Sequence, residues 1–415
     1  MCATPTIRIE DPLAEQPQPP SGFALFNYGF RPFFLLAGLF GMLSVPMWVG
    51  LYAGHVDLNL VAAPMLWHGH EMLFGYTTAA IVGFLLTVVP NWTKVKARKG
   101  NILIVLSVLW LAGRVAFWAQ GYIPYGVVMA VDMLFLIVFT ALVMRPLIDP
   151  QYRRQLMFMP ILLALVVANA MTHLGIAGFD MPGLDWGPDM GLRGLTLGLD
   201  ATVVLIALMA GRVTPSFTSS FLGHGDPTIK VLQRPKLERA VMGATWAILV
   251  VDQVLPASSI AGSVALIAAI LHAVRLSGWQ GHRTLSNPIL WVLHLGYVWL
   301  IAGLALKGLS DFGVLAAADG VHALTIGAIG TITLGVMTRA ALGHTGRAVK
   351  AAPAIVGAYV LVSVAALVRL ATIVWPEHST ELVMASGLLW TAAFAAFVAV
   401  YAPVLMRPRL DGRPG

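Results

Sequence analysis

Apolar segments of about 20 residues, separated by short polar stretches, account for nearly all of the chain after residue 30. A helix needs about that length to cross the hydrocarbon core of a bilayer. The least distinct boundary lies between the seventh and eighth segments, where Pro256 to Ser258 mark the turn. The twelve segments span residues 32–52, 70–90, 101–120, 124–144, 156–178, 193–211, 239–256, 259–276, 288–307, 320–339, 353–374 and 382–404. The pattern predicts an all-α polytopic membrane protein whose twelve transmembrane helices form one domain, residues 23–405.

Composition supports this class of protein. Hydrophobic residues make up 58% of the chain and charged residues 11%, whereas soluble domains carry about 25% charged residues. Residues 1–22 are polar and proline-rich, and they predict a disordered cytoplasmic tail rather than a signal peptide. Residues 406–415 predict a second cytoplasmic tail. The single cysteine, Cys2, excludes an intrachain disulfide and a cysteine-ligated iron–sulfur cluster.

The formal net charge of +7 indicates membrane topology rather than nucleic-acid binding. Most Lys and Arg residues lie in the segments that would be cytoplasmic if the N-terminus is inside. Basic residues gather in the cytoplasmic loops of membrane proteins. We therefore expect both termini in the cytoplasm, and no nucleic-acid partner.

Three of the predicted helices share sequence features at a spacing of four helices. The second and sixth end at Val88–Thr93 and Val213–Thr218, which both read V-x-P-[NS]-aromatic-T. The tenth ends at Val336–Arg339, a similar distance further along the chain. The second and tenth also match in the spacing of a histidine and two glycines: His70, Gly75 and Gly83 against His322, Gly327 and Gly335. The alternatives are three tandem four-helix units or chance matches between short apolar strings.

Ionisable groups gather at the depth of the predicted outer face. Such groups are costly inside a membrane and are candidates for function. Imidazole suits haem iron, copper and zinc, and a nearby carboxylate can orient a ligating imidazole. The residues at this level are His68, His70, Glu71, Arg114, Asp132, His173, Asp200 and His322.

Each of these residues also has a plain structural interpretation. His68 and His70 are two residues apart, about 200° around a helix, so a regular helix cannot aim both at one metal. Either one of them lies in the preceding loop, or they serve different sites, or they are interfacial histidines beside Trp67. His173 is a ligand or a polar core residue paired with Asn169.

The buried charges are open to two interpretations as well. Arg114 and Asp132 form a structural ion pair, or a pair that tunes a redox potential or takes part in proton transfer. Asp200 is a proton-relay acid or is hydrogen-bonded to Thr196 and Thr202.

A second, smaller group of residues lies toward the predicted inner face. His272 and His294 come to comparable depth on the eighth and ninth helices, where they suit a second bis-imidazole haem site, proton transfer or a structural role. Arg339 lies at the end of the tenth helix and is a further candidate for cofactor binding. The glycine-bracketed stretch Leu342–Arg347 closes this helix, and its His344 and Arg347 could meet an anion or a haem propionate. The chain has no Walker loop, GxSxG, HExxH or CxxCH motif, so any haem is held without thioether links.

Several blocks of the sequence together resemble the NnrS family. They are Phe30–Phe34, the WHGHEM to PNWT stretch of Trp67–Thr93, Arg212–Thr218, and His322 through the MTRAALGHTGR motif. The resemblance runs over nearly the whole chain. It implies a twelve-helix protein of the bacterial inner membrane that contains haem and copper and acts in denitrification and in relief of nitric oxide stress.

The architecture is also similar to the catalytic subunit of haem–copper oxidases and nitric oxide reductases. In that subunit, outer-side histidines on helices two and ten ligate the low-spin haem. This resemblance implies that His70 and His322 are axial ligands, with His68 as the alternative for the first. The seventh helix has no histidine, so the usual ligands of a binuclear centre are missing. For copper we expect another set, drawn from His68, His173 and Glu71.

The resulting expectation is a haem- and copper-binding membrane protein that handles nitric oxide or protects against nitrosative stress. The alternative is a proton-coupled transporter of a metal or nitrogen-oxide species, with Asp200 and the proline breaks after the second and sixth helices along its path. Neither the oligomeric state nor catalytic turnover follows from the sequence.

Overall fold

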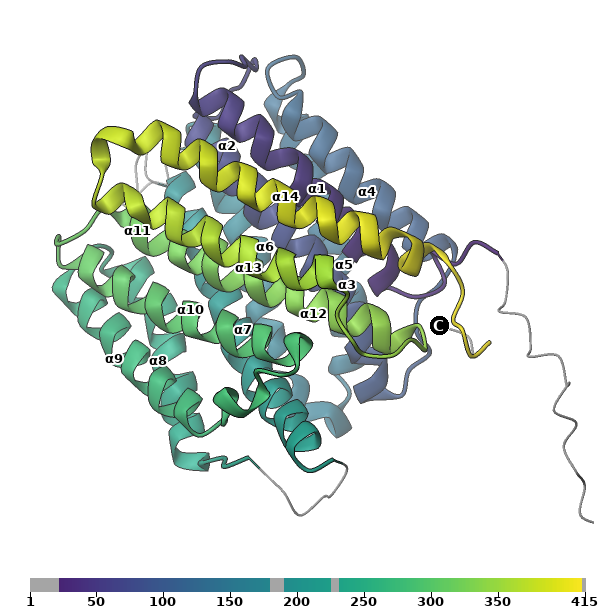
Figure 1. Ribbon diagram of the computed structural model, residues 1–415. Coiled ribbons are helices and arrows are strands. Elements are labelled where there is room, and N and C mark those ends of the chain that lie inside the picture. Colours follow the sequence, from purple (N-terminus) through teal and green to yellow (C-terminus); the bar gives the residue numbers. More distant parts are fainter. Residues whose placement is uncertain (1–21, 180–189, 225–230, 413–415) are drawn as a thin grey trace, which may run out of the picture.

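Twelve long helices run side by side in a computed structural model that describes residues 22–179, 190–224 and 231–412 (Figure 1). The first half comprises α1 (Phe30–Tyr52), α2 (Pro64–His70) continuing through η1 (Glu71–Thr77) into α3 (Thr78–Thr93), α4 (Asn101–Trp118), α5 (Tyr125–Leu147), α6 (Phe158–Ile176) and α7 (Met190–Leu222). The second half comprises α8 (Pro235–Val254), α9 (Ser259–Ser277), α10 (Pro288–Asp311), α11 (Ala317–His322) continuing through η5 (Ala323–Gly330) into α12 (Thr331–His344), α13 (Pro353–Leu370) and α14 (Ser379–Met406). Short 3-10 helices lie at η2 (Pro150–Gln155), η4 (Gly281–Thr284), η6 (Ala371–Ile373) and η7 (Pro376–His378).

The all-α polytopic prediction is confirmed. Eleven helices of the described part are long and apolar enough to cross a membrane. The twelfth, α8, carries Lys236, Glu238 and Arg239 in its first turns and Asp252 near its end, and it packs between α7 and α9. The predicted turn before α9 is present, where the Ser258 hydroxyl accepts a hydrogen bond from the Ala261 amide at 3.1 Å. The tail predicted over residues 1–22 lies almost wholly outside the described residues.

Two of the long helices contain a π-helical segment, and each segment begins directly after a histidine. Residues Glu71–Thr77 follow His70, and residues Ala323–Gly330 follow His322. π-Helical turns are rare and occur mostly at functional sites. The likeness between the second and tenth helices therefore extends from sequence to local backbone geometry, while α7 is α-helical over its whole length.

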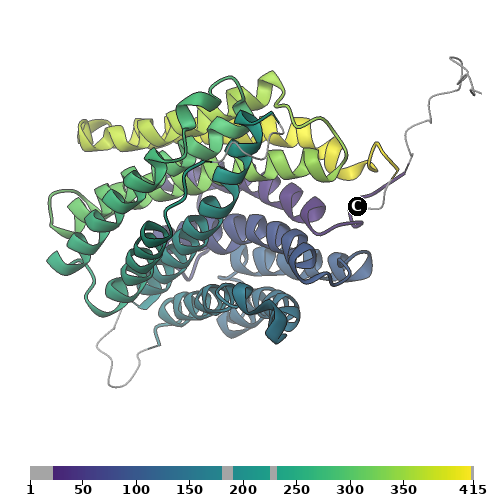
Figure 2. The ribbon, with the colours of Figure 1, turned by 90° about the horizontal axis from the view of Figure 1, so that it is seen from below.

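The three helices with related sequences lie at the centre of the bundle. Residues of α2–η1–α3, α7 and α11–η5–α12 together line two cavities, one at each end of the bundle. Most residues in the apolar stretches of these three helices are buried, and Figure 2 shows the bundle from below. We call the cavity beside His68 and His322 the outer cavity, and the one beside Arg339 and His344 the inner cavity.

Both ends of the described chain meet at one end of the bundle. The Ala24 amide donates a hydrogen bond to the Met406 carbonyl at 2.8 Å. The Arg31 guanidinium donates to the carbonyls of Leu405 at 2.8 Å and Arg407 at 2.7 Å. The two termini therefore lie on the same side of any membrane the bundle spans.

The native Cys2 allows the predicted orientation to be tested. If the N-terminus is cytoplasmic, a membrane-impermeant maleimide should leave Cys2 unlabelled in intact cells and label it after permeabilisation. A Cys2→Ser, Asp57→Cys variant, with its cysteine in the loop between α1 and α2, should show the reverse preference. Labelling of Cys2 in intact cells would contradict a cytoplasmic N-terminus.

Candidate metal and cofactor sites

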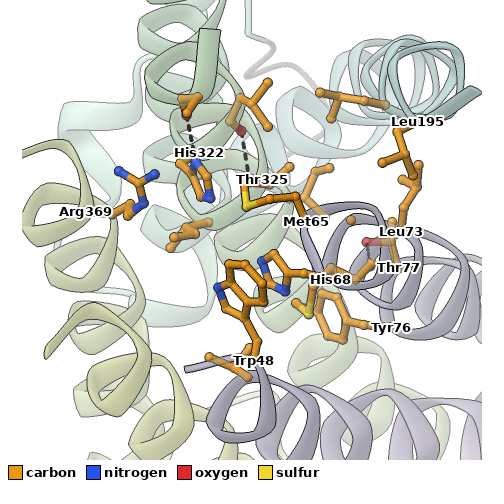
Figure 3. Close-up of a pocket in the computed structure, with 18 of the residues that line it drawn as sticks. Trp48, Met65, His68, Leu73, Tyr76, Thr77, Leu195, His322, Thr325 and Arg369 are labelled. Carbon is orange, nitrogen blue, oxygen red and sulfur yellow. Dashed lines mark hydrogen bonds between the residues drawn. The ribbon is translucent and has the colours of Figure 1, made fainter. Parts of the chain in front are cut away.

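The outer cavity has a volume of about 320 Å³ and lies among α1, α2, α7, α11, α13 and α14. Three side chains that can bind metals or anions face it (Figure 3): His68 from α2, His322 from α11 and Arg369 from α13. The rest of the wall is largely apolar, with Met65, Met72, Leu195, Leu199, Ile326 and Trp390 among its members. The cavity thus presents two imidazoles and one guanidinium to an otherwise apolar space.

The His322 ring is held in one orientation by the backbone. Its Nδ1 lies 2.6 Å from the Ala318 carbonyl oxygen one turn earlier. Because a carbonyl oxygen only accepts, Nδ1 carries the hydrogen and Nε2 keeps its lone pair. Metal-ligating histidines are commonly fixed in this way, with the second nitrogen donating to a carbonyl or carboxylate. His322 is therefore prepared to act as a ligand through Nε2.

The His68 ring is oriented by stacking. Its ring lies parallel to the Trp48 indole, at 4.4 Å between centroids and 12° between planes. Arg369, across the cavity, donates to the Thr372 hydroxyl at 2.9 Å. No acidic side chain among the described residues forms an ion pair with Arg369, although Asp319 is near enough to act on it electrostatically. The guanidinium can therefore pair with an anionic group in the cavity.

His70 faces a separate, buried cluster. Each of its ring nitrogens faces an oxygen that can accept a hydrogen bond: Nδ1 lies 3.2 Å from Glu71 Oε1, and Nε2 lies 3.0 Å from Asn169 Oδ1. The ring stacks on Phe117, with 3.8 Å between centroids. The backbone of α2 thus directs His68 into the outer cavity and His70 away from it, as the 200° separation requires for one continuous helix.

Arg114 lies at the centre of this cluster and joins four helices. Its guanidinium makes ion pairs with Glu71 and Asp132, and all three side chains are buried. The Trp118 indole donates to Glu71 at 2.5 Å, and the Asn169 amide donates to Asp132 at 2.9 Å. The predicted Arg114–Asp132 pair is therefore one part of a larger network.

His173 completes the network. Its Nε2 lies 3.0 Å from Asp132 Oδ2, and its Nδ1 lies 3.0 Å from the Tyr125 hydroxyl. Since the carboxylate accepts, Nε2 donates to Asp132 and Nδ1 accepts from Tyr125. His173 is thus tied to α5 by both of its ring nitrogens.

The ligand atoms of His70, Asp132 and His173 all lie within 4.8 Å of one another. The Asp132 oxygen is 3.3 Å from His70 Nε2 and 3.0 Å from His173 Nε2. Ligands about 2.0–2.1 Å from a tetrahedral metal are about 3.3 Å apart, so the spacing fits a metal ion. The same spacing also suits hydrogen bonds. A metal would have to displace the proton on His173 Nε2, so metal and protons would compete for the site.

Three other predicted residues occupy separate surroundings. Asp200 lies near Asp252 of α8 and Lys307 of α10. Its Oδ2 has no hydrogen-bond partner among the described residues, and the Thr196 and Thr202 hydroxyls donate to carbonyls of their own helix. The partners of His272 are Thr245 at 3.0 Å and Tyr297 at 2.6 Å, whereas His294 lies 3.0 Å from the Thr218 hydroxyl. His272 and His294 therefore have no hydrogen-bonding partner in common. Arg339 and His344 line the inner cavity.

Three residues of these sites did not stand out in the sequence as candidates. Arg369 is a charge within a predicted membrane helix, and that position alone was a usable signal. Trp118 and Tyr125 gave no such signal, because an aromatic residue near the end of a membrane helix is common at the membrane interface. Their roles depend on contacts with helices distant in the sequence.

The Arg114 network should make a large contribution to stability. Replacing Arg114 by Met leaves Glu71 and Asp132 buried without a cation, and removing one partner of a buried pair costs about 3–5 kcal/mol. We expect a markedly lower midpoint of thermal unfolding for Arg114→Met in detergent.

The matched control removes the two carboxylate charges as well. Arg114→Met combined with Glu71→Gln and Asp132→Asn should recover most of the lost stability, because no unpaired charge then remains. An equal loss of stability in the single and triple variants would show that packing, not charge pairing, is the main contribution.

Comparison with known proteins adds an independent result. A family model described as NnrS protein matches residues 24–409, a range that includes all twelve long helices, both cavities and the Arg114 network. A search of curated proteins gave no match. Membership of this family broadly supports a role for the chain as a membrane protein of the nitric oxide response. Since the match covers nearly the whole chain, the protein belongs to the NnrS family.

Proposed function

We propose that this protein binds haem and copper in the bacterial inner membrane, with both termini cytoplasmic, and handles nitric oxide during denitrification or nitrosative stress. The observation that carries the proposal is that His68 and His322, from the two helices with π-helical segments, face one cavity (Figure 3). Family membership supports the same role.

The residues of the outer cavity fit a haem group chemically. Imidazole is a common axial ligand of haem iron, and His322 already has Nε2 free to ligate. His68 supplies the second imidazole, which takes the place of His70 in the pair first expected. Arg369 suits a haem propionate, because guanidinium pairs well with carboxylate. When bound, haem would supply an iron centre with affinity for nitric oxide.

The residues of the buried cluster fit a copper ion. His70, Asp132 and His173 offer two imidazoles and one carboxylate oxygen, and imidazole is a suitable ligand for copper. Tyr125 and Asn169 orient His173 and Asp132 from outside the ligand set, as residues around metal sites usually do. Arg114 balances one of the two carboxylate charges and so keeps the pocket from being strongly anionic.

A transporter of a metal or nitrogen-oxide species is the second candidate. It is favoured by the position of the two cavities along the same three helices. Between them, the Tyr76 hydroxyl lies 2.5 Å from the Thr333 hydroxyl. A transporter need not retain haem through purification, whereas the first proposal requires a bound cofactor.

An optical spectrum of the purified protein tests the haem site. We expect a Soret band that is lost, or strongly shifted, in His68→Ala and in His322→Ala, since each substitution removes one imidazole that would hold the haem. His70→Ala should keep the low-spin spectrum. The exposed His378 provides a control, since His378→Ala should leave the band unchanged.

Two outcomes would contradict these assignments. Loss of the spectrum in His70→Ala but not in His68→Ala would restore the His70–His322 pair. Protein purified from haem-sufficient cells with neither haem nor copper would overturn the proposal itself.

Metal analysis tests the copper site separately. We expect the molar ratio of copper to protein to fall at least tenfold in His173→Ala and in Asp132→Asn, since each removes one ligand. Copper content should also fall as pH is lowered, because protons compete for the imidazole nitrogens. Asp200→Asn, a buried carboxylate outside the cluster, is the control and should retain copper. Full copper content in both ligand variants would assign the cluster a structural role.

A further inference from the structure

The inner cavity is the larger of the two, at about 440 Å³. It lies among α1, α3, α7, α10 and α12, at the end of the bundle where the termini meet. Its wall is rich in aromatic side chains, which are Phe34, Phe84, Trp92 and Phe217. An aromatic and aliphatic lining of this kind is typical of sites that bind apolar molecules.

Two basic side chains interrupt this apolar wall. The Arg339 guanidinium carbon lies over the Phe217 ring, 3.6 Å from its centroid. Within the described part of the chain, Arg339 makes no ion pair. The His344 ring is packed against aromatic rings too, with its centroid 6.1 Å from that of Tyr28 and the planes 18° apart.

An uncompensated cation beside an apolar space is costly, and an anion placed there would offset the cost. The cation–π contact with Phe217 compensates for only part of the lost hydration, since such contacts contribute about 0.5–2 kcal/mol. The apolar wall disfavours a small hydrophilic anion, which would lose its water without replacement. The positive charge of Arg339 disfavours the binding of a cation.

We propose that the inner cavity binds an amphipathic carboxylate, with its carboxylate at Arg339 and His344 and its apolar body among Phe84, Trp92 and Phe217. Arg339 pairs with the carboxylate, and His344 donates a hydrogen bond to it when its ring nitrogen facing the ligand is protonated. The site is distinct from the outer cavity. The Tyr76–Thr333 contact lies between the two cavities, so each can be occupied separately.

The charge requirement is tested with a fluorescent probe, cis-parinaric acid, and its uncharged methyl ester. The full-length protein in nanodiscs should bind the acid more tightly than the ester. Arg339→Gln should weaken binding of the acid at least tenfold, the effect of losing a hydrogen bond to a charged group, and should leave binding of the ester unchanged. Unchanged ester binding also shows that the variant is folded.

Arg212 provides the matched control for charge. It also packs over an aromatic ring, with its guanidinium carbon 5.7 Å from the centroid of Phe158, but it does not line the cavity. Arg212→Gln should therefore leave binding of the acid unchanged. Equal affinity for the acid and the ester, or equal effects of Arg339→Gln and Arg212→Gln, would overturn the proposal. Arg339 would then be a side chain that extends toward the membrane surface without binding a ligand.

The location is tested by filling the cavity. Gly343 lines it, and a Cβ atom added there would meet no other atom within 4 Å. Gly343→Leu should lower binding of both acid and ester at least tenfold, because the leucine occupies the space of the apolar body. Gly357 on α13 is equally open but lies outside the cavity. Gly357→Leu should therefore change the binding of neither the acid nor the ester. Undiminished binding in Gly343→Leu would place the probe elsewhere and overturn the assignment.

Competition identifies the source of the carboxylate. Displacement of the probe by oleate supports a fatty-acyl ligand, and displacement by protoporphyrin IX supports a porphyrin carboxylate. Displacement by neither, at concentrations that saturate the site, would overturn the proposed ligand class.

Discussion

A charged side chain buried in an apolar helical bundle is costly unless an opposite charge pairs with it, and the half of this protein that contains the outer cavity is arranged around one such pairing. Arg114 on α4 is buried between Glu71 and Asp132. Those carboxylates in turn fix His70, Asn169 and His173. The network therefore sets the relative positions of α2, α4, α5 and α6. It also determines which face of α2 remains for the outer cavity, and that face carries His68.

The π-helical segments explain why two similar helices can serve this cavity. A π-helical turn contains more residues than an α-helical turn, so it changes which side chains face the centre beyond it. In α2–η1–α3 the change occurs just after His70, and Tyr76 within the segment reaches Thr333 on the other modified helix. In a regular α-helix, successive side chains would keep the same rotation of about 100° throughout. The π-helical segment changes this rotation, so the part of the helix that carries the histidine and the part that follows the segment contact different neighbouring helices.

Hydropathy predicted nearly the whole fold, because the requirement for about 20 apolar residues leaves a strong signal for each helix. It also grouped several ionisable residues that meet in the structure, but it did not give their directions around the helix axis. His68 and His70 illustrate the limit, since their spacing requires different directions without saying which histidine shares a cavity with His322. The π-helical segments and the approach of Arg369 from α13 depend on packing between distant helices. The sequence position of Arg369 marks it as a candidate, but no local sequence pattern predicts which cavity it faces or where a π-helical segment begins.

The meeting of the two chain ends has a consequence for biosynthesis. Arg31, at the start of α1, donates hydrogen bonds to carbonyls at the end of α14, and α13 and α14 contribute Arg369 and Trp390 to the wall of the outer cavity. These two helices follow the other elements of the wall in the chain, so the wall is incomplete until the ribosome has synthesised α14. Any ligand that needs the whole cavity must be delivered after that point. Premature termination within α13 or α14 would leave an opened cavity rather than a shortened but closed bundle.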